Sequence, residues 1–384
     1  MTNMNVAVAI PDLCGYLEAG GHWSWALQYL LGLKDLGHNV CMLEFIRSSG
    51  RQQADQQRID CCLAMLNKYG LRESACVIVV PAKENPSLEN MKVYCTRYRS
   101  FEELASDTDI LLNLGCTVRP PLLQLFGHRI LLDEDPGHLQ ISALSWELGI
   151  YEHHRWLTVG LNVGHEDCLV PTLGLNWETH FPVVYLPMWT ADVRPLDPSM
   201  PISSVTHWSW DELSFKGNPL HIGKREAYLR YVDLPARTGE SFELAVVLPD
   251  KEIPAERQRL EAAGWKIIDP WREIGSPEAY QAFIRHSRAE LCCAKEAFRV
   301  LNTGWLSDRS AAYMALGRPV IADDTGFRKY IETGRGLLSV QGIEDAVSAV
   351  IQISRDYETH SRIARELASA YFDSRRVLPK ILGV

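Results

Sequence analysis

Several motifs that would assign a function at once are missing from this chain of 384 residues. No GxGxxG follows the first predicted strand, which argues against a nicotinamide-dependent dehydrogenase, and the absence of GxxxxGK[ST] excludes a P-loop nucleotide site. None of the ten cysteines forms a CxxC pair, so a structural zinc site of the usual spacing is not expected. The cysteines are scattered through a long chain, which indicates reduced thiols rather than a disulfide framework.

Long apolar runs and excess positive charge are also lacking. The apolar run at 6–10 is too short for a signal peptide or a membrane span and has no basic segment before it, so we expect a cytoplasmic protein. Lys and Arg total 39 against 48 Asp and Glu, which gives a net charge of −9. This balance argues against binding to nucleic acid or anionic lipid through bulk charge, although a local basic groove is compatible with it.

What the sequence does contain is a regular alternation of short β-branched runs with amphipathic stretches. Helices are predicted at 24–36 and 53–69, which end at Gly37 and Gly70. Alternation of this kind buries a mainly parallel sheet under helices and places ligands at the carboxyl ends of the strands. The predicted strands of this first half are 6–10, 39–45, 76–80, 110–112, 129–132 and 182–186.

The alternation restarts after a segment in which Pro187, Pro195, Pro198 and Pro201 occur close together. Such a density resists regular structure and suits a linker. We therefore predict an α/β protein with two Rossmann-like domains that face a cleft, residues 1–190 and 202–357, with a terminal helix at 358–384 that packs back on the first. The second domain has predicted strands at 202–208, 242–247, 266–268, 289–293, 319–322 and 336–338, and helices near 223–232, 253–263, 277–287, 307–316 and 342–354.

The first candidate site is Gly20, Gly21 and His22, between the first strand and the helix that follows it. Paired glycines let backbone amides approach an anion, and a helix N-terminus adds partial positive charge. His22 can take up a proton near neutral pH at the functional edge of the sheet. The alternative is a simple strand-to-helix turn.

The second candidate site spans a glycine turn, a helix, a buried strand and an acidic loop. Ser307 is a predicted N-cap, amides at the helix start suit a diphosphate, and Arg309 can add charge-assisted bonds. The acids after the next strand can accept hydrogen bonds from sugar hydroxyls. The predicted binding residues are Thr303, Gly304, Trp305, Ser307, Asp308, Arg309, Ser310, Asp323, Asp324, Thr325 and Gly326.

Two further groups lie at predicted strand ends. Asp133 and Asp135 flank a glutamate after the strand at 129–132, and either could orient His22 or bind a substrate; the alternative is a solvated acidic loop. Lys224 and Lys295 follow turns or strands of the second half, where cations would meet a diphosphate, or could equally be solvated.

Both halves resemble GT-B glycosyltransferases. The AGGHW segment and Leu36-Gly37-His38-Asn39-Val40 are similar to the opening of the lipid-linked peptidoglycan N-acetylglucosaminyltransferase, where a TGGH loop precedes a helix. The SDRS, GRPV and DTGF segments are similar to a donor motif of bacterial glycosyltransferase-like proteins. The helix segment is two residues longer than in the plant-type donor signature and lacks its terminal His.

The resemblance implies transfer of a sugar from a nucleotide-sugar, with UDP as the expected nucleotide, to an unknown acceptor in the cleft. It places the donor in the second domain and the acceptor in the first, and it implies neither a metal nor a resident cofactor. The alternatives are a sugar-nucleotide epimerase, a noncatalytic sugar-nucleotide-binding protein and a phage-type DNA-modifying glycosyltransferase, so a nucleic acid acceptor stays open.

Overall fold

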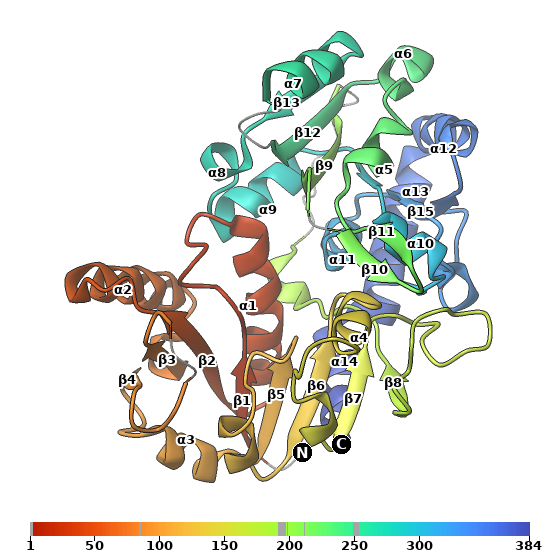
Figure 1. Ribbon diagram of the computed structural model, residues 1–384. Helices are drawn as coiled ribbons and strands as arrows, with labels where there is room; N and C mark the ends of the chain where they lie inside the picture. The colour runs from red at the N-terminus through yellow and green to blue at the C-terminus, as the bar shows by residue number, and fades with distance from the viewer. Residues whose placement is uncertain (1–2, 84–85, 191–196, 198, 211, 249–252) are drawn as a thin grey trace.

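The computed structural model describes residues 3–83, 86–190, 197, 199–210, 212–248 and 253–384. Within this part of the chain, two large sheets lie one beyond the other, each packed against helices (Figure 1). The first has eight strands in the order β4-β3-β2-β1-β5-β6-β7-β8, and the second has six in the order β13-β12-β9-β14-β15-β16. In both sheets the neighbouring strands are parallel, apart from the antiparallel pair β3 and β4. The predicted α/β architecture is thus confirmed.

The strands of the first sheet are β1 (Asn5–Ala9), β2 (Asn39–Arg47), β3 (Ala75–Val80), β4 (Lys92–Cys95), β5 (Ile110–Leu114), β6 (Arg129–Asp133), β7 (Arg155–Thr158) and β8 (Trp177–Thr179). The strands of the second sheet are β9 (Ile202–His207), β12 (Phe242–Val247), β13 (Trp265–Ile268), β14 (Ala289–Cys292), β15 (Val320–Asp323) and β16 (Leu337–Val340). A separate hairpin is formed by β10 (Glu212–Phe215) and β11 (Asn218–His221), which the sequence analysis did not predict.

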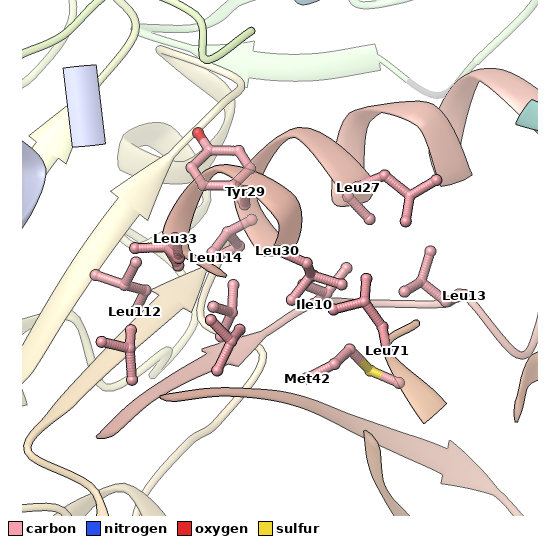
Figure 2. Close-up of a cluster of buried hydrophobic side chains, with 14 of the residues drawn as sticks. Ile10, Leu13, Leu27, Tyr29, Leu30, Leu33, Met42, Leu71, Leu112 and Leu114 are labelled. Carbon is pink, nitrogen blue, oxygen red and sulfur yellow. The ribbon is translucent and has the colours of Figure 1, made fainter. Parts of the chain in front are cut away.

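The first sheet is buried on both faces, which explains the unbroken apolar run of β3. Helix α1 (Gly20–Asp35) covers one face, where its Leu27, Leu30 and Leu33 pack with side chains from three of the central strands or their ends (Figure 2). Helix α3 (Phe101–Asp107) packs within the cluster on the other face. Helix α1 ends before Gly37, whose φ of +88° is the left-handed conformation expected of a glycine after a helix.

Helices also cover the second sheet, and α9 (Pro277–Arg285) among them has the side-chain cap that its sequence indicates. This helix begins after Ser276, whose hydroxyl accepts a hydrogen bond from the Ala279 amide. Three further helices occupy predicted positions: α7 (Ile253–Ala262), α11 (Asp308–Ala315) and α12 (Ile343–Arg355). Short helices in the second half include α5 (Arg225–Leu229), α8 (Pro270–Glu273) and α10 (Glu296–Val300), and the first half has the short helix α4 (His138–Ser142). No helix among the described residues is long and apolar enough to cross a membrane.

The end of the chain returns to the first sheet. Helix α13 (Tyr357–Leu367) runs into a wide turn at Ala368–Phe372, and α14 (Ser374–Leu382) then packs on α1. The contact is close, because a Cβ on Gly32 would lie 2.7 Å from a methyl carbon of Leu378. The predicted terminal helix is therefore interrupted: α14 returns to the first half as expected, whereas α13 packs against α11 and α12 of the second half.

The segment between the two sheets differs from the sequence prediction, and part of it lies outside the described residues. The strand predicted at 182–186 is wrong: Val184 forms only an isolated bridge with Asp373, and β7 and β8 extend the sheet instead. Pro182 and Pro187 bound the run, and proline has no N–H to donate to a neighbouring strand. Of the predicted linker, 191–196 and 198 lie outside the described residues, while Pro187 lies in a short turn of 3-10 helix.

Candidate functional site

A cavity of about 370 Å³ lies between the two sheets, lined by residues from both halves of the chain. The first half contributes the start of α1 and the carboxyl ends of β6 and β7, and the second contributes the start of α11 and part of α9. We call it the reaction cavity. Its lining residues are Gly21, His22, Trp25, Glu134, Val159, Val205, Tyr280, Trp305, Leu306, Asp308 and Arg309.

His22 enters the reaction cavity from the first turn of α1, with its ring stacked on Trp25 at 5.3 Å between centroids. Its Nε2 lies 2.8 Å from the carbonyl oxygen of Pro11, just beyond β1. A carbonyl only accepts, so Nε2 carries the hydrogen and Nδ1 is left as the basic nitrogen. Burial lowers the pKa of His22 from its ordinary value of 6.5, an effect opposed by the Pro11 bond. The imidazole is therefore neutral at pH 7 and able to accept a proton.

The two predicted aspartates do not orient His22, because each is engaged elsewhere. Asp133 is buried and accepts hydrogen bonds from Gln140 and from Thr158, each at 2.7 Å. Asp135 pairs with Lys295 at 2.5 Å between Nζ and Oδ2, which ties the end of β6 to the loop after β14. The sequence interpretation is corrected on this point, since the Pro11 carbonyl takes the orienting role.

Glu134, which the sequence interpretation passed over, is the acid of the first half that lines the reaction cavity. Its Oε1 accepts a hydrogen bond from the Tyr29 hydroxyl. Burial raises the pKa of Glu134 to about 8, although the Tyr29 bond acts in the opposite direction. Strand alternation could not have singled it out, because β6 ends at Asp133 and the chain bends at Glu134.

The paired glycines are needed for close packing rather than as an open anion-binding loop. Gly20 and Gly21 are the first residues of α1, which meets α9 of the second half (Figure 1). A Cβ on Gly20 would lie 2.2 Å from the carbonyl oxygen of Ile274 and 2.3 Å from that of Ser276. A Cβ on Gly21 would lie 3.2 Å from the Tyr280 ring. Gly21 lines the reaction cavity, whereas Gly20 is pressed against the second half.

Three residues of the predicted donor motif reach the reaction cavity: Trp305, Asp308 and Arg309. The predicted N-cap is confirmed, since the Ser307 hydroxyl accepts from the Arg309 amide at 3.2 Å. The Arg309 guanidinium already has a partner within the protein, because its Nε lies 2.5 Å from Oε1 of Glu290 on β14. The expectation of a simple ligand-facing arginine is thus corrected to a buried ion pair beside the cavity.

Other motif residues pack against the first half at Asn162. A Cβ on Gly304 would lie 2.7 Å from the Asn162 backbone nitrogen, and one on Gly326 would lie 2.2 Å from its side-chain nitrogen. The backbone N–H of Asn162 donates a hydrogen bond to the Thr303 carbonyl oxygen, 3.0 Å away. The hydroxyl of Thr325 donates to the Trp305 carbonyl, and Ser310 is buried in α11. This turn joins the two halves.

The predicted acidic loop is also committed to internal bonds. Asp323 is the last residue of β15 and not a loop residue, and its carboxylate accepts from the Tyr231 hydroxyl, the Arg230 guanidinium and the Ala294 amide. Asp324 accepts from the Gly326 amide at 2.9 Å and pairs with Arg328. The expected role of these acids in accepting sugar hydroxyls is corrected accordingly.

Lys224 lies within electrostatic range of Arg309 and Lys295. The ammonium of Lys224 lies 5.2 Å from the centroid of the Trp305 ring, so it borders the reaction cavity. Burial, together with the charges of Arg309 and Lys295, lowers the pKa of Lys224 to about 8. Arg309 is paired with Glu290 and Lys295 with Asp135, but no carboxylate of the described chain pairs with Lys224. This edge therefore has a positive charge available for an anion.

Comparison with solved structures identifies the architecture. The chain is similar to an α-glucosyltransferase in complex with UDP and a 13-mer DNA containing an HMU base (TM-score 0.59, 10% identity, 100% of this chain and 99% of the other). It is also similar to HepE of Anabaena in complex with UDP and glucose (0.57, 12%, 99% and 99%) and to a glycosyltransferase of Rickettsia africae (0.53, 13%, 100% and 98%). These likenesses show the fold, so the predicted GT-B architecture is confirmed. No protein-family profile matches the sequence, and no curated protein matches it.

Proposed function

We propose that the protein is a glycosyltransferase that moves a sugar from a nucleotide-sugar, with UDP as the nucleotide, to an acceptor in the cleft. The observation that carries the proposal is the unpaired Lys224, which lies with Arg309 and Lys295 beside a cavity whose opposite wall holds the neutral His22. Cations on one wall and a base on the other suit displacement of an anionic leaving group. Proteins of the same fold bound to UDP favour this nucleotide.

The diphosphate of the donor is placed at Lys224 in this proposal. A phosphate oxygen there would supply the counter-charge that the buried ammonium lacks, and nearby Arg309 and Lys295 would add to the positive field. Trp305 lies between Lys224 and the reaction cavity, where its ring can support the sugar or the diphosphate.

In the reaction, an acceptor hydroxyl oxygen attacks the anomeric carbon of the sugar. The bond from that carbon to the diphosphate oxygen breaks, and the leaving nucleoside diphosphate keeps the electron pair. Nδ1 of His22 takes the hydroxyl proton, which it can do because the Pro11 carbonyl holds Nε2–H and burial keeps the ring neutral. The cations beside Lys224 stabilise the charge that develops on the leaving group.

We also propose that the reaction needs neither a divalent metal nor a resident cofactor, since the unpaired Lys224 ammonium can supply the positive charge at the expected diphosphate position. Activity should then survive EDTA. The domains are proposed as 1–190 and 202–357, with α14 of the terminal segment 358–384 packed on the first. The free state of all ten cysteines is consistent with the cytoplasm as the proposed location.

The test is a ligand screen by thermal unfolding with UDP, GDP, ADP and dTDP and their sugar conjugates. A ligand that binds only the folded state raises the melting temperature by mass action, and we expect UDP and UDP-sugars to do so. An unchanged melting temperature with every nucleotide at millimolar concentration would refute the donor site. Product analysis then separates the alternatives, because a transferase releases UDP whereas an epimerase interconverts UDP-sugars without releasing it.

A further inference from the structure

The reaction cavity continues into two more cavities along the first sheet. The next, of about 510 Å³, shares Trp25 and Glu134 with it. That cavity in turn shares Pro11, Arg119 and Glu147, among others, with a third of about 570 Å³. We call the second and third cavities together the acceptor groove. It follows the carboxyl ends of β1, β5 and β6 and opens at Glu134 onto the site where His22 lies.

The acceptor groove carries no excess of positive charge. Two arginines line it, Arg47 and Arg119, and they face a larger set of acids: Asp12, Asp133, Glu134, Asp135 and Glu147. Of these acids, Asp135 is neutralised by Lys295. Proteins that hold a polynucleotide neutralise several phosphates with Lys and Arg, and a groove lined by more acids than arginines gives little such attraction. The net charge of −9 adds to this disadvantage.

One wall of the acceptor groove presents an aromatic ring to solvent. Trp146 lines the cavity of about 510 Å³ and is 71% exposed. Leu139 and Leu148 lie on the same wall, and Glu147 and Arg119 supply carboxylate and guanidinium groups next to it. A flat apolar ring beside charged groups that donate and accept hydrogen bonds matches a sugar, which has an apolar ring face and a rim of hydroxyls.

We propose that the acceptor is an uncharged carbohydrate, with one sugar ring stacked on Trp146 and its hydroxyls bonded to Glu147 and Arg119. This inference rests on the proposed glycosyltransferase function and adds the class of acceptor. The chain of the acceptor follows the groove, and its reacting hydroxyl enters the reaction cavity past Glu134. A DNA acceptor is the competing possibility that the test must address.

The experiment measures UDP release from UDP-sugars by the full chain. The probes are neutral oligosaccharides, from disaccharides to pentasaccharides in gluco, galacto and manno series, and single-stranded and duplex DNA oligonucleotides. We expect transfer to members of the oligosaccharide set and none to DNA. Trp146→Ala should raise the KM for the oligosaccharide about tenfold, the loss of one well-placed aromatic contact. Its dissociation constant for UDP should stay unchanged.

Tyr151→Ala is the matched control, because Tyr151 is an aromatic residue of the same half, is 60% exposed and lines none of the three cavities. It should leave the acceptor KM unchanged. Equal KM values for the two variants, or transfer to DNA alone, would overturn the carbohydrate assignment. Bound UDP with no transfer to any oligosaccharide would also overturn it while leaving the donor site intact. Failure to bind any nucleotide would refute the proposed function itself.

Discussion

Glu290 and Arg309 form an ion pair beneath the reaction cavity, in which the Glu290 side chain has no exposed surface and that of Arg309 is 12% exposed. Oε1 of Glu290 meets the guanidinium, while Oε2 is buried and has no hydrogen-bond partner among the described residues. Arg309 is thus the partner on which the Glu290 carboxylate depends. Removing the arginine would leave a charge buried without compensation.

Arg309→Ala should therefore destabilise the protein by about 3–5 kcal/mol, the cost of breaking a buried ion pair from one side. Urea unfolding followed by circular dichroism measures the change. The double variant Arg309→Met with Glu290→Leu should recover most of the loss, because it removes both charges together. A single variant as stable as the wild type, with only weaker UDP binding, would show that the guanidinium faces the ligand instead.

The variant Lys224→Met should weaken UDP binding without lowering the stability of the protein. The side chain is buried among like charges without a carboxylate partner, so its removal should leave the free energy of unfolding unchanged or higher. The same change should weaken UDP binding by about 1.5–3 kcal/mol, the scale of a hydrogen bond to a charged group. Calorimetric titration and urea unfolding provide the two readouts. A loss of stability without a loss of affinity would contradict the placement of the diphosphate.

UDP affinity should fall as the pH rises above about 8, the lowered pKa of Lys224 in the free protein. Below that pH the ammonium is already charged, whereas above it a proton must be taken up when the diphosphate binds. For the same reason the free protein should gain stability between about pH 8 and the ordinary lysine pKa of 10.5. Titrations from pH 7 to 9.5 test this, and the slope should disappear in Lys224→Met.

His22→Ala should lower turnover by roughly 100- to 10,000-fold, the contribution of a positioned general base. Nucleotide affinity should stay close to that of the wild type. Because burial lowers the pKa of His22 below 6.5, turnover should decline only on the acid side of that value, where the ring becomes protonated. His128→Ala, at the opposite end of β6, is the control. Weaker UDP binding with intact turnover would assign His22 to substrate contact.

Gly20→Ala should disrupt the contact between α1 and the second half, since the added methyl group would overlap the carbonyl oxygens of Ile274 and Ser276. We expect a loss of stability of about 1–3 kcal/mol, as for overpacking in a core, together with reduced turnover. Gly127→Ala is the matched control, because a Cβ there meets nothing within 4 Å. Thermal unfolding and initial rates give the comparison. Equal behaviour of the two variants would contradict the close approach.

Periodicity and turn residues were enough to predict most of the fold. Strands such as β3 and β12 are buried apolar runs, and Gly37 and Gly70 end helices in the left-handed conformation that their position predicts. The hairpin of β10 and β11 escaped prediction because its strands are short and polar, and Pro219 within it weakens the pattern. The alternating strands and helices can thus be predicted from local sequence, whereas a hairpin that departs from this alternation cannot.

The candidate site was harder to predict, because its chemistry depends on partners far away in the sequence. Arg309 and Asp323 carry charges that suit a ligand, yet each is engaged by a residue that only the folded chain brings near, such as Glu290 and Tyr231. His22 was located by its place after a strand, whereas its Pro11 partner could not be inferred from the sequence. Residue type shows which groups are able to react, and tertiary contacts decide which of them are available.

The bonds at Val184 bear on how the cleft can change its width. The Val184 amide donates to the Phe372 carbonyl and its own carbonyl accepts from the Ser374 amide, both at 2.8 Å. The two stretches of chain that connect the sheets are therefore fastened to each other at one point. A movement that changes the width of the cleft would therefore have to carry Val184 and Phe372 together or break both bonds. Separating the walls that hold Lys224 and His22 is thus coupled to the end of the chain.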